Sequence, residues 1–342
     1  MTASLSFSFR FKRGQEPAFL HERFKFMFVR EPYHRLWSAY VDKFLLPDLW
    51  HVDGNKILRH RANVTSKLEH TDARNVKRVF KRSVKLETTD AKTSNRSKSL
   101  TALTNDSSSM TDAKEQNEKH DVTKDTRKKQ CSDDVTFTDF LDYVTSEKPL
   151  RLNEHYRPYH FLCSPCIFRP QVIGKMETFE EDSGNILQRL NLSWVGKEVG
   201  TTEERALHEM KMLIDDNFYG LRSDFFKLKD CMNSTELAWR LWKAFQINGY
   251  LPRNVSFPLR PGQSVTMTQF RDLVFSTYRH TGVTSKQFWR DQKTRAFVDA
   301  YREVPDRVLE KVRKVFDADF RLFDYDPYPE LVYSYRKIHR KR

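Results

Sequence analysis

The sequence contains no apolar run long enough to cross a membrane as a helix. Such a helix needs about 20 consecutive apolar residues, and no window of the 342-residue chain approaches that length. Residues 1–11 alternate Phe with small polar residues, a run too short and interrupted for the apolar core of a signal peptide. Read alone, the sequence predicts a chain that does not itself enter a membrane.

Cysteine is scarce, and its spacing leaves few kinds of site open. The four cysteines are Cys131, Cys163, Cys166 and Cys231. The C-x-x-C pair has a spacing used by zinc sites, redox centres and disulfides. Zinc needs two more good ligands; His155 and His160 are near in sequence, but no second paired cluster exists. A Pro soon after the pair argues against a redox motif, and an even cysteine count fits two disulfides in an oxidising compartment.

Glycosylation sequons also favour an oxidising, secretory compartment. Six N-x-S/T sequons are present, at Asn63, Asn95, Asn105, Asn191, Asn233 and Asn254. All six are candidate glycosylation sites.

The charge balance predicts an anionic partner. The net charge is +14, with 60 Lys and Arg against 46 Asp and Glu. Nucleic acid, an acidic membrane and a sulfated glycan all fit such a charge. The chain lacks a helix-turn-helix, zinc-finger or RNP-like signature, which argues against nucleic acid. The content of 38% hydrophobic residues is enough for a packed core.

Composition divides the chain into segments. Residues 64–133 are nearly free of aromatic side chains and crowded with Ser, Thr, Lys, Asp and Asn. Residues 88–130 in particular cannot bury enough apolar surface to offset the entropy lost on ordering, so we expect a disordered insert. The expected boundaries are an N-terminal segment 1–23, a strand-helix unit 24–63, the insert 64–133, the remaining domain 134–330 and a basic tail 331–342.

Two segments read as a buried strand followed by a helix. Residues 24–29 form an apolar run, and Pro32 suits the first turn of a helix in which Leu36, Tyr40 and Phe44 share one face. Residues 166–175 and 180–190 repeat the strand-helix order. This alternation favours an α/β fold with a parallel sheet.

The first strand-helix junction predicts an anion site. Free N–H groups and the helix dipole favour a negative group at the amino end of a helix. Arg30 lies at the junction and can grip phosphate with its planar fork, while Ser38 offers a hydroxyl two turns further on. Alternatively, Arg30 pairs with a carboxylate and Ser38 is a small packing residue.

The same segment resembles a known phosphate-binding motif. The sequence FVREPYHRLWSAYVDKF, residues 28–44, is similar to the 3′-phosphate motif of Golgi carbohydrate sulfotransferases. The group of that family most similar to the chain contains the chondroitin and dermatan 4-O-sulfotransferases and the HNK-1 sulfotransferase. The resemblance implies that Arg30 and Ser38 hold the 3′-phosphate of 3′-phosphoadenosine 5′-phosphosulfate (PAPS), and that Arg35 anchors the helix or weakly faces this phosphate.

Further blocks resemble the family in the same order. They are NKILRHR (55–61), FTDFLDY (137–143), NEHY (153–156), LCSPC (162–166), IGKMET (173–178) and DFRLFDY (319–325). The resemblance implies an α/β fold with a parallel-sheet, P-loop-like sulfotransferase core, here with additional helices and the disordered insert. It also implies a type II membrane protein of the Golgi lumen that takes part in proteoglycan biosynthesis.

Two expected family features are not recognisable. Residues 1–23 show neither the membrane anchor nor the family's 5′-phosphosulfate loop, whose Lys stabilises the leaving phosphate. The sequence is therefore expected to be a fragment or a divergent member, with weak or absent PAPS turnover. The block 195–290 is longer than in the family.

The resemblance implies transfer of a sulfonate from PAPS to a glycan hydroxyl, with no metal required. His155 is the candidate base, because a neutral imidazole titrates in the right range; it could instead simply pack beside the cysteine pair. Arg59, Arg61 and Lys175 are candidates for contacting an anionic acceptor, although basic residues are often only solvated. The alternative to an enzyme is a non-catalytic glycan-binding member that has lost the donor loop.

Overall fold

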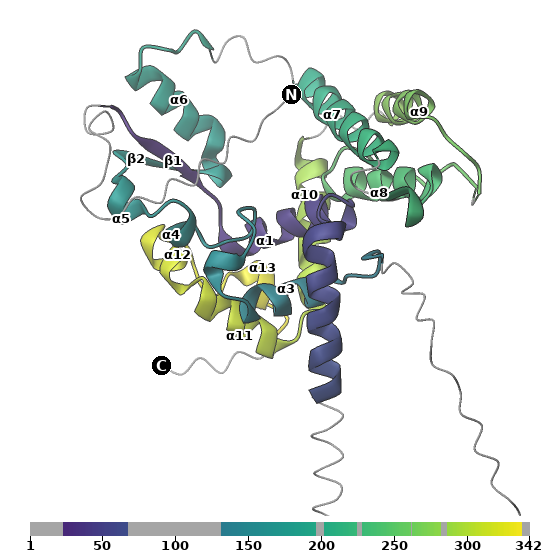
Figure 1. The fold of residues 1–342 in the computed structure, drawn as a ribbon. Coiled ribbons are helices and arrows are strands. Elements are labelled where there is room, and N and C mark those ends of the chain that lie inside the picture. Colours follow the sequence, from purple (N-terminus) through teal and green to yellow (C-terminus); the bar gives the residue numbers. More distant parts are fainter. Residues whose placement is uncertain are drawn as a thin grey trace, which may run out of the picture. The chain divides into compact units, whose positions relative to one another are not determined.

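The computed structural model describes residues 23–67, 131–195, 202–223, 228–260, 262–281 and 286–336. The chain divides into two compact units, one formed by residues 1–60 with 131–342 and the other by residues 61–130. The labelled elements of Figure 1 belong to the first unit. The insert expected over residues 88–130 lies outside the described residues.

A two-stranded parallel sheet lies at the predicted junction. Strand β1 (Phe26–Val29) pairs with β2 (Val172–Lys175), and Phe28 lies opposite Gly174. β1 matches the predicted apolar run. β2 begins later than expected, because Pro165 starts a short helix, α5 (Pro165–Phe168), within the segment predicted as strand.

Each face of this sheet packs against another part of the chain, although Phe26 and Ile173 remain exposed. Met27 and Val29 pack with Phe323, near the carboxyl end of the chain. On the other face, the Phe28 ring contacts Phe179, the first residue of α6 (Phe179–Arg189), with ring centroids 5.0 Å apart. A Cβ atom on Gly174 would lie 2.5 Å from the Phe28 ring, so only glycine permits this close approach.

The chain continues from β1 into α1 (Pro32–Tyr40), with Pro32 in the first turn as predicted. Two π-helical turns follow, η2 (Val41–Leu45) and η3 (Trp50–Gly54). A further helix covers residues 55–67.

The other secondary-structure elements of the described chain are helices. They are α3 (Phe137–Ser146), η4 (Pro149–Arg151), α4 (Tyr159–Leu162), η5 (Met176–Thr178), α7 (Thr202–Arg222), η7 (Leu228–Asp230), α8 (Ser234–Ile247), α9 (Met267–His280), α10 (Lys286–Arg302), α11 (Asp306–Val315), α12 (Asp317–Leu322) and α13 (Glu330–Tyr333). Side chains at the starts of α3, α8 and α9 form capping boxes that satisfy free backbone N–H groups. The box of α3 is the Thr136–Asp139 pair.

The main hydrophobic core joins α1 to the later helices. Tyr33, Leu36, Phe140, Trp242 and Tyr301 are fully or almost fully buried in it. The described chain is thus mostly helical with one small parallel sheet, a smaller sheet than the α/β prediction implied. The P-loop-like core remains a prediction. None of the described helices has the length and apolar character needed to span a bilayer.

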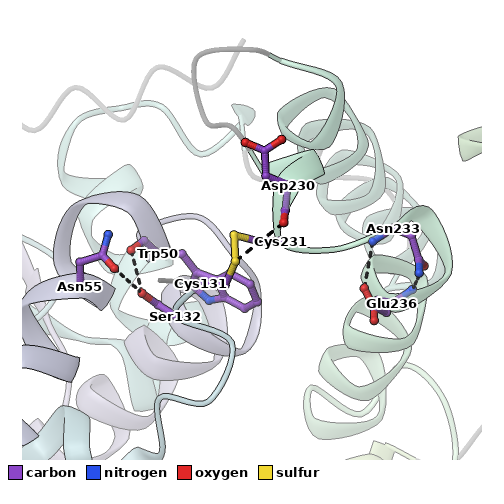
Figure 2. The surroundings of a disulfide bond; sticks show 8 residues. All are labelled: Trp50, Asn55, Cys131, Ser132, Asp230, Cys231, Asn233 and Glu236. Atoms are coloured by element: carbon purple, nitrogen blue, oxygen red, sulfur yellow. Dashed lines mark hydrogen bonds between the residues drawn. A yellow bond between two sulfur atoms is a disulfide. The ribbon is translucent and has the colours of Figure 1, made fainter. Parts of the chain in front are cut away.

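A disulfide joins two segments that are distant in sequence. Cys131 and Cys231 are bonded, with a sequence separation of 100. Figure 2 shows this bond between the segment that begins at residue 131 and the turn preceding α8. Beside it, the Ser132 hydroxyl lies 3.1 Å from the Trp50 carbonyl oxygen, which ties the same segment to η3.

Candidate functional site

The predicted donor-binding residues lie on the β1–α1 unit. Arg30 directly follows β1, and Ser38 lies in the second turn of α1; both side chains are partly exposed. The positive charge of Arg30 acts on Tyr159 and on Lys293 of α10. Lys293 is thus a cation close enough to Arg30 for their charges to interact, and no sequence motif pointed to it.

The Glu31 side chain caps the amino end of α1. Its Oε2 atom accepts hydrogen bonds from the backbone N–H of His34 at 2.7 Å and from the His34 ring at 2.9 Å. The backbone N–H of Glu31 in turn donates to Glu177 Oε1 at 2.9 Å. The amino end predicted as an open anion site is thus capped by the protein's own carboxylate, and an anion would depend on the cationic side chains instead.

The second Glu31 oxygen has no donor. Among the described residues, Oε1 of Glu31 is buried without a hydrogen-bond partner. A buried acceptor left without a partner is unfavourable by about 1–3 kcal/mol. This atom is therefore an unsatisfied acceptor buried at the amino end of α1.

Arg35 anchors α1 to the segment before α4. It donates to the carbonyl oxygens of Arg157 at 2.6 Å and Glu154 at 2.8 Å, and its guanidinium stacks on the Tyr159 ring at 3.8 Å. Burial lowers the pKa of Arg35. These contacts favour the anchoring role over a phosphate-facing one.

His155 lies in a different charged environment from Arg30. Its ring Nδ1 lies 2.6 Å from Asn153 Oδ1, which fixes the ring orientation. Burial, and then the positive charge of Lys43, lowers the pKa of His155. The charges that act on it in the described chain come from Lys43, Glu154, Asp42 and Asp48, and no contact described there joins it to Arg30.

Lys175 faces the carboxyl-terminal segment of the described chain. Its Nζ donates to the Asp324 carbonyl oxygen at 3.1 Å and lies 4.6 Å from the centre of the Tyr325 ring. The Tyr325 hydroxyl donates to Glu177 Oε2 at 2.9 Å. Burial, followed by this hydrogen bond, raises the pKa of Tyr325.

The two predicted acceptor-binding arginines lie on the helix over residues 55–67. Arg59 is exposed, and its Nε donates to the Asn55 carbonyl oxygen at 3.0 Å. Arg61 is partly exposed and belongs to the second compact unit.

The sequons fall into two groups. Asn63, Asn191, Asn233 and Asn254 are exposed, whereas Asn95 and Asn105 lie outside the described residues.

Only one of the two predicted disulfides is formed in the described chain. Cys131 and Cys231 are bonded, whereas Cys163 and Cys166 are free thiols. Cys163 ends α4 and Cys166 lies in α5, with Ser164 between the two helices at a φ of 43°. Burial raises the pKa of Cys163, so its reactive thiolate is disfavoured.

A second oriented histidine was missed by the sequence motifs. The buried Asp319 carboxylate accepts hydrogen bonds from the backbone N–H groups of Tyr159 at 2.6 Å and His160 at 2.9 Å. Its Oδ1 also lies 2.6 Å from Nδ1 of the His160 ring. Asp319 is the first residue of the DFRLFDY block, so the sequence motif included it. The sequence did not indicate that His160 is its partner.

Two cavities lie near these elements. One of about 450 Å³ borders α1, α8 and α10, and Trp37, Lys243 and Arg253 are among its lining residues. Trp37 is the residue of α1 that lines this cavity; Ser38 and Arg30 are not among its lining residues. The other, of about 340 Å³, is lined by Cys231 and Trp239 beside the disulfide. Within the described ranges, no cluster of three or more His, Cys, Asp or Glu side chains is arranged to hold a metal ion.

Comparison with known proteins agrees with the motif. The sulfotransferase family matches residues 2–103 and 101–212, a match that includes the segment 1–23. Carbohydrate sulfotransferase 14 of Danio rerio is 44% identical over 63 residues, which are 18% of this chain and 17% of that protein. The human protein of the same name is 43% identical over 58 residues, covering 17% and 15%.

A differently numbered carbohydrate sulfotransferase is also similar to the chain. Carbohydrate sulfotransferase 11 of Mus musculus is 39% identical over 64 residues, or 18% of each chain. The matched segment thus spans less than a fifth of these relatives. No solved structure matches the chain. Because the family match covers more than half of its length, the chain belongs to the sulfotransferase family.

Proposed function

We propose that this protein transfers a sulfonate from PAPS to a hydroxyl of a glycosaminoglycan or related glycan of the chondroitin or dermatan type. The observation that carries this proposal is the β1–α1 unit, where Arg30 follows a parallel strand and Ser38 lies on the following helix. The carbohydrate sulfotransferases among its relatives support a glycan acceptor. We place the reaction in the Golgi lumen; the disulfide suits an oxidising compartment.

PAPS supplies the sulfonate, and residues of the β1–α1 unit would hold its nucleotide part. The planar fork of Arg30 and the hydroxyl of Ser38 would bind the 3′-phosphate.

In this proposal His155 takes the proton that the acceptor hydroxyl loses. The hydroxyl oxygen forms a bond to sulfur as the bond from sulfur to the 5′-phosphate oxygen breaks. The lowered pKa keeps the imidazole neutral and ready to accept this proton. Arg59, Arg61 and Lys175 would contact the anionic groups of the glycan, which agrees with the net charge of +14.

Nucleotide binding and sulfate transfer test this function separately. The chain is expected to bind 3′-phosphoadenosine 5′-phosphate (PAP) in titration calorimetry. It is expected to transfer labelled sulfate from PAPS to chondroitin or dermatan only slowly, because residues 1–23 show no recognisable 5′-phosphosulfate loop. Arg30→Ala should weaken PAP binding at least about tenfold, because a charge-assisted hydrogen bond is worth about 1.5–3 kcal/mol. Ser38→Ala should weaken it less, and His155→Gln should reduce transfer without reducing PAP binding.

Arg321→Ala is a suitable control. Arg321 is exposed and pairs with Asp317 on α12, so its loss should leave PAP binding unchanged. Glycan binding without transfer by the wild-type chain would favour the non-catalytic alternative. Unchanged PAP affinity in Arg30→Ala would contradict the proposed donor site.

A further inference from the structure

One face of α10 runs along the start of α1. The Tyr301 hydroxyl donates to the Tyr33 carbonyl oxygen at 2.8 Å, and the Phe297 ring stacks on the His34 ring with centroids 4.1 Å apart. Residues four apart in a helix lie on the same face, one turn above the other. Lys293 therefore occupies the next position of this face, one turn before Phe297.

The aliphatic part of the Lys293 side chain packs against Gly249. Gly249 lies directly against it, since a Cβ atom on Gly249 would be 3.2 Å from Lys293 Cγ. Gly249 has a φ of 76°, which favours glycine at this position independently of the available space. The residue as a whole remains exposed, although its charged end is partly desolvated. The lysine thus combines a packed stem with a charge that water or a ligand can reach.

The charge of Lys293 is unfavourable in the free protein. Desolvation, and then the positive charge of Arg30, lowers its pKa. Glu209 also acts on Lys293 but hydrogen-bonds the Tyr250 hydroxyl, and Glu31 Oε2 accepts from His34. Two cations whose mutual repulsion is incompletely neutralised create a site that favours an anion.

We propose that Lys293 is the second cation of the 3′-phosphate subsite, acting on the same phosphate as Arg30. This inference rests on the proposed function, because it takes Arg30 to face that phosphate. Lys293 lies in the helical block that no family motif covers, and the family match ends at residue 212. A residue from outside the shared blocks therefore completes the donor site.

Three nucleotides locate the phosphate that Lys293 contacts. PAP, adenosine 3′-monophosphate and adenosine 5′-monophosphate are titrated calorimetrically into the wild-type chain and Lys293→Met. The variant should lose about tenfold affinity for PAP and for the 3′-monophosphate, with the 5′-monophosphate unchanged. Lys293→Arg should retain most of the affinity. The matched control is Lys314→Met, which removes an exposed lysine of α11 and should change none of the three.

Thermal unfolding adds a second measurement. Lys293→Met should melt at a higher temperature than the wild type without ligand, because the repulsion with Arg30 is gone. PAP should raise the melting temperature of the variant less than that of the wild type. If Lys293 had only a structural role, Lys293→Met would neither melt at a higher temperature than the wild type nor respond less to PAP.

The outcomes separate this inference from the proposed function. If Arg30→Ala loses PAP binding while Lys293→Met binds all three nucleotides as the wild type does, the role of Lys293 is wrong and the donor site stands. A loss confined to the 5′-monophosphate also overturns it. If the wild-type chain binds none of the nucleotides, both proposals fail.

Discussion

Arg35 shows how one buried side chain fixes the position of the helix that carries Ser38. Its two hydrogen bonds end on carbonyl oxygens of the segment before α4, and Tyr159 covers its guanidinium. Since β1 is only four residues long, the orientation of α1 depends on such side-chain contacts as well as on the core.

Replacing Arg35 should therefore destabilise the protein rather than only weaken a ligand. In Arg35→Met, two partly buried carbonyl groups lose their donors, so we expect the free energy of unfolding in urea to fall by about 2–4 kcal/mol. Arg35→Lys should be intermediate, because it keeps the charge but loses the fork. An Arg35→Met protein of normal stability with impaired PAP binding would show that the residue faces phosphate instead.

His155 makes stability depend on pH in a defined direction. Its pKa in the folded protein is lowered from the ordinary 6.5, by burial first and then by Lys43. The unfolded chain therefore takes up the proton at a higher pH than the folded chain. At a pH above the pKa of His155 in the unfolded chain, this residue does not affect the free energy of unfolding. As the pH falls below that value and through the pKa of the folded protein, the free energy of unfolding decreases.

The effect can be isolated with melting curves between about pH 8 and pH 5. The His155→Gln variant should show a shallower fall in melting temperature on acidification than the wild type. His280→Gln serves as the control, since His280 is exposed near the end of α9. Equal slopes for wild type and His155→Gln would contradict the lowered pKa.

Among the secondary-structure elements, the paired strands were the most predictable. The apolar run before Arg30 indicated β1, and Pro32 placed the start of α1 correctly. The second strand was predicted too long, because an apolar run does not separate a strand from a short helix, and Pro165 decided in favour of α5. The insert was inferred from composition, and most of it lies outside the described residues.

Gly174 in β2 provides a test of how tightly this sheet is packed. Gly174→Ala would place a Cβ atom 2.5 Å from the Phe28 ring, which is itself held by Phe179. We expect a loss of about 1–3 kcal/mol in urea unfolding. Gly184→Ala in α6 is the matched control, because nothing lies within 4 Å of its added methyl group. That control should stabilise the helix by up to about 1 kcal/mol.

At the scale of the whole molecule, the disulfide supplements a core built largely from helices. It links Cys131 to Cys231 across 100 positions, and a loop of that length is restricted strongly in the unfolded chain. Reduction, or Cys231→Ser, should lower the free energy of unfolding by about 3–5 kcal/mol. Unfolding curves with and without a reductant measure this. Cys166→Ser should unfold as the wild type does, because Cys166 is a free thiol.

The site was predictable from the sequence only where its residues are close together in the chain. Arg30 and Ser38 belong to one continuous motif and could be named without the structure. The stacking of Phe297 on His34 and the pairing of His160 with Asp319 depend on segments that pack across 159 or more positions. No local pattern encodes such pairs. The cap of α1 by Glu31 was missed because Glu is an uncommon residue at that position.

Glu177 connects three parts of the chain that are far apart in sequence. One of its oxygens accepts from the backbone N–H beside Arg30, and the other accepts from Tyr325. Ordering of the backbone beside Arg30 should therefore also order the segment around Tyr325. Local opening of these two segments should be cooperative. PAP should slow amide hydrogen exchange around Tyr325 as well as around Arg30, and Glu177→Gln should diminish the distant protection. The carboxyl-terminal segment would then report on donor occupancy without touching the nucleotide.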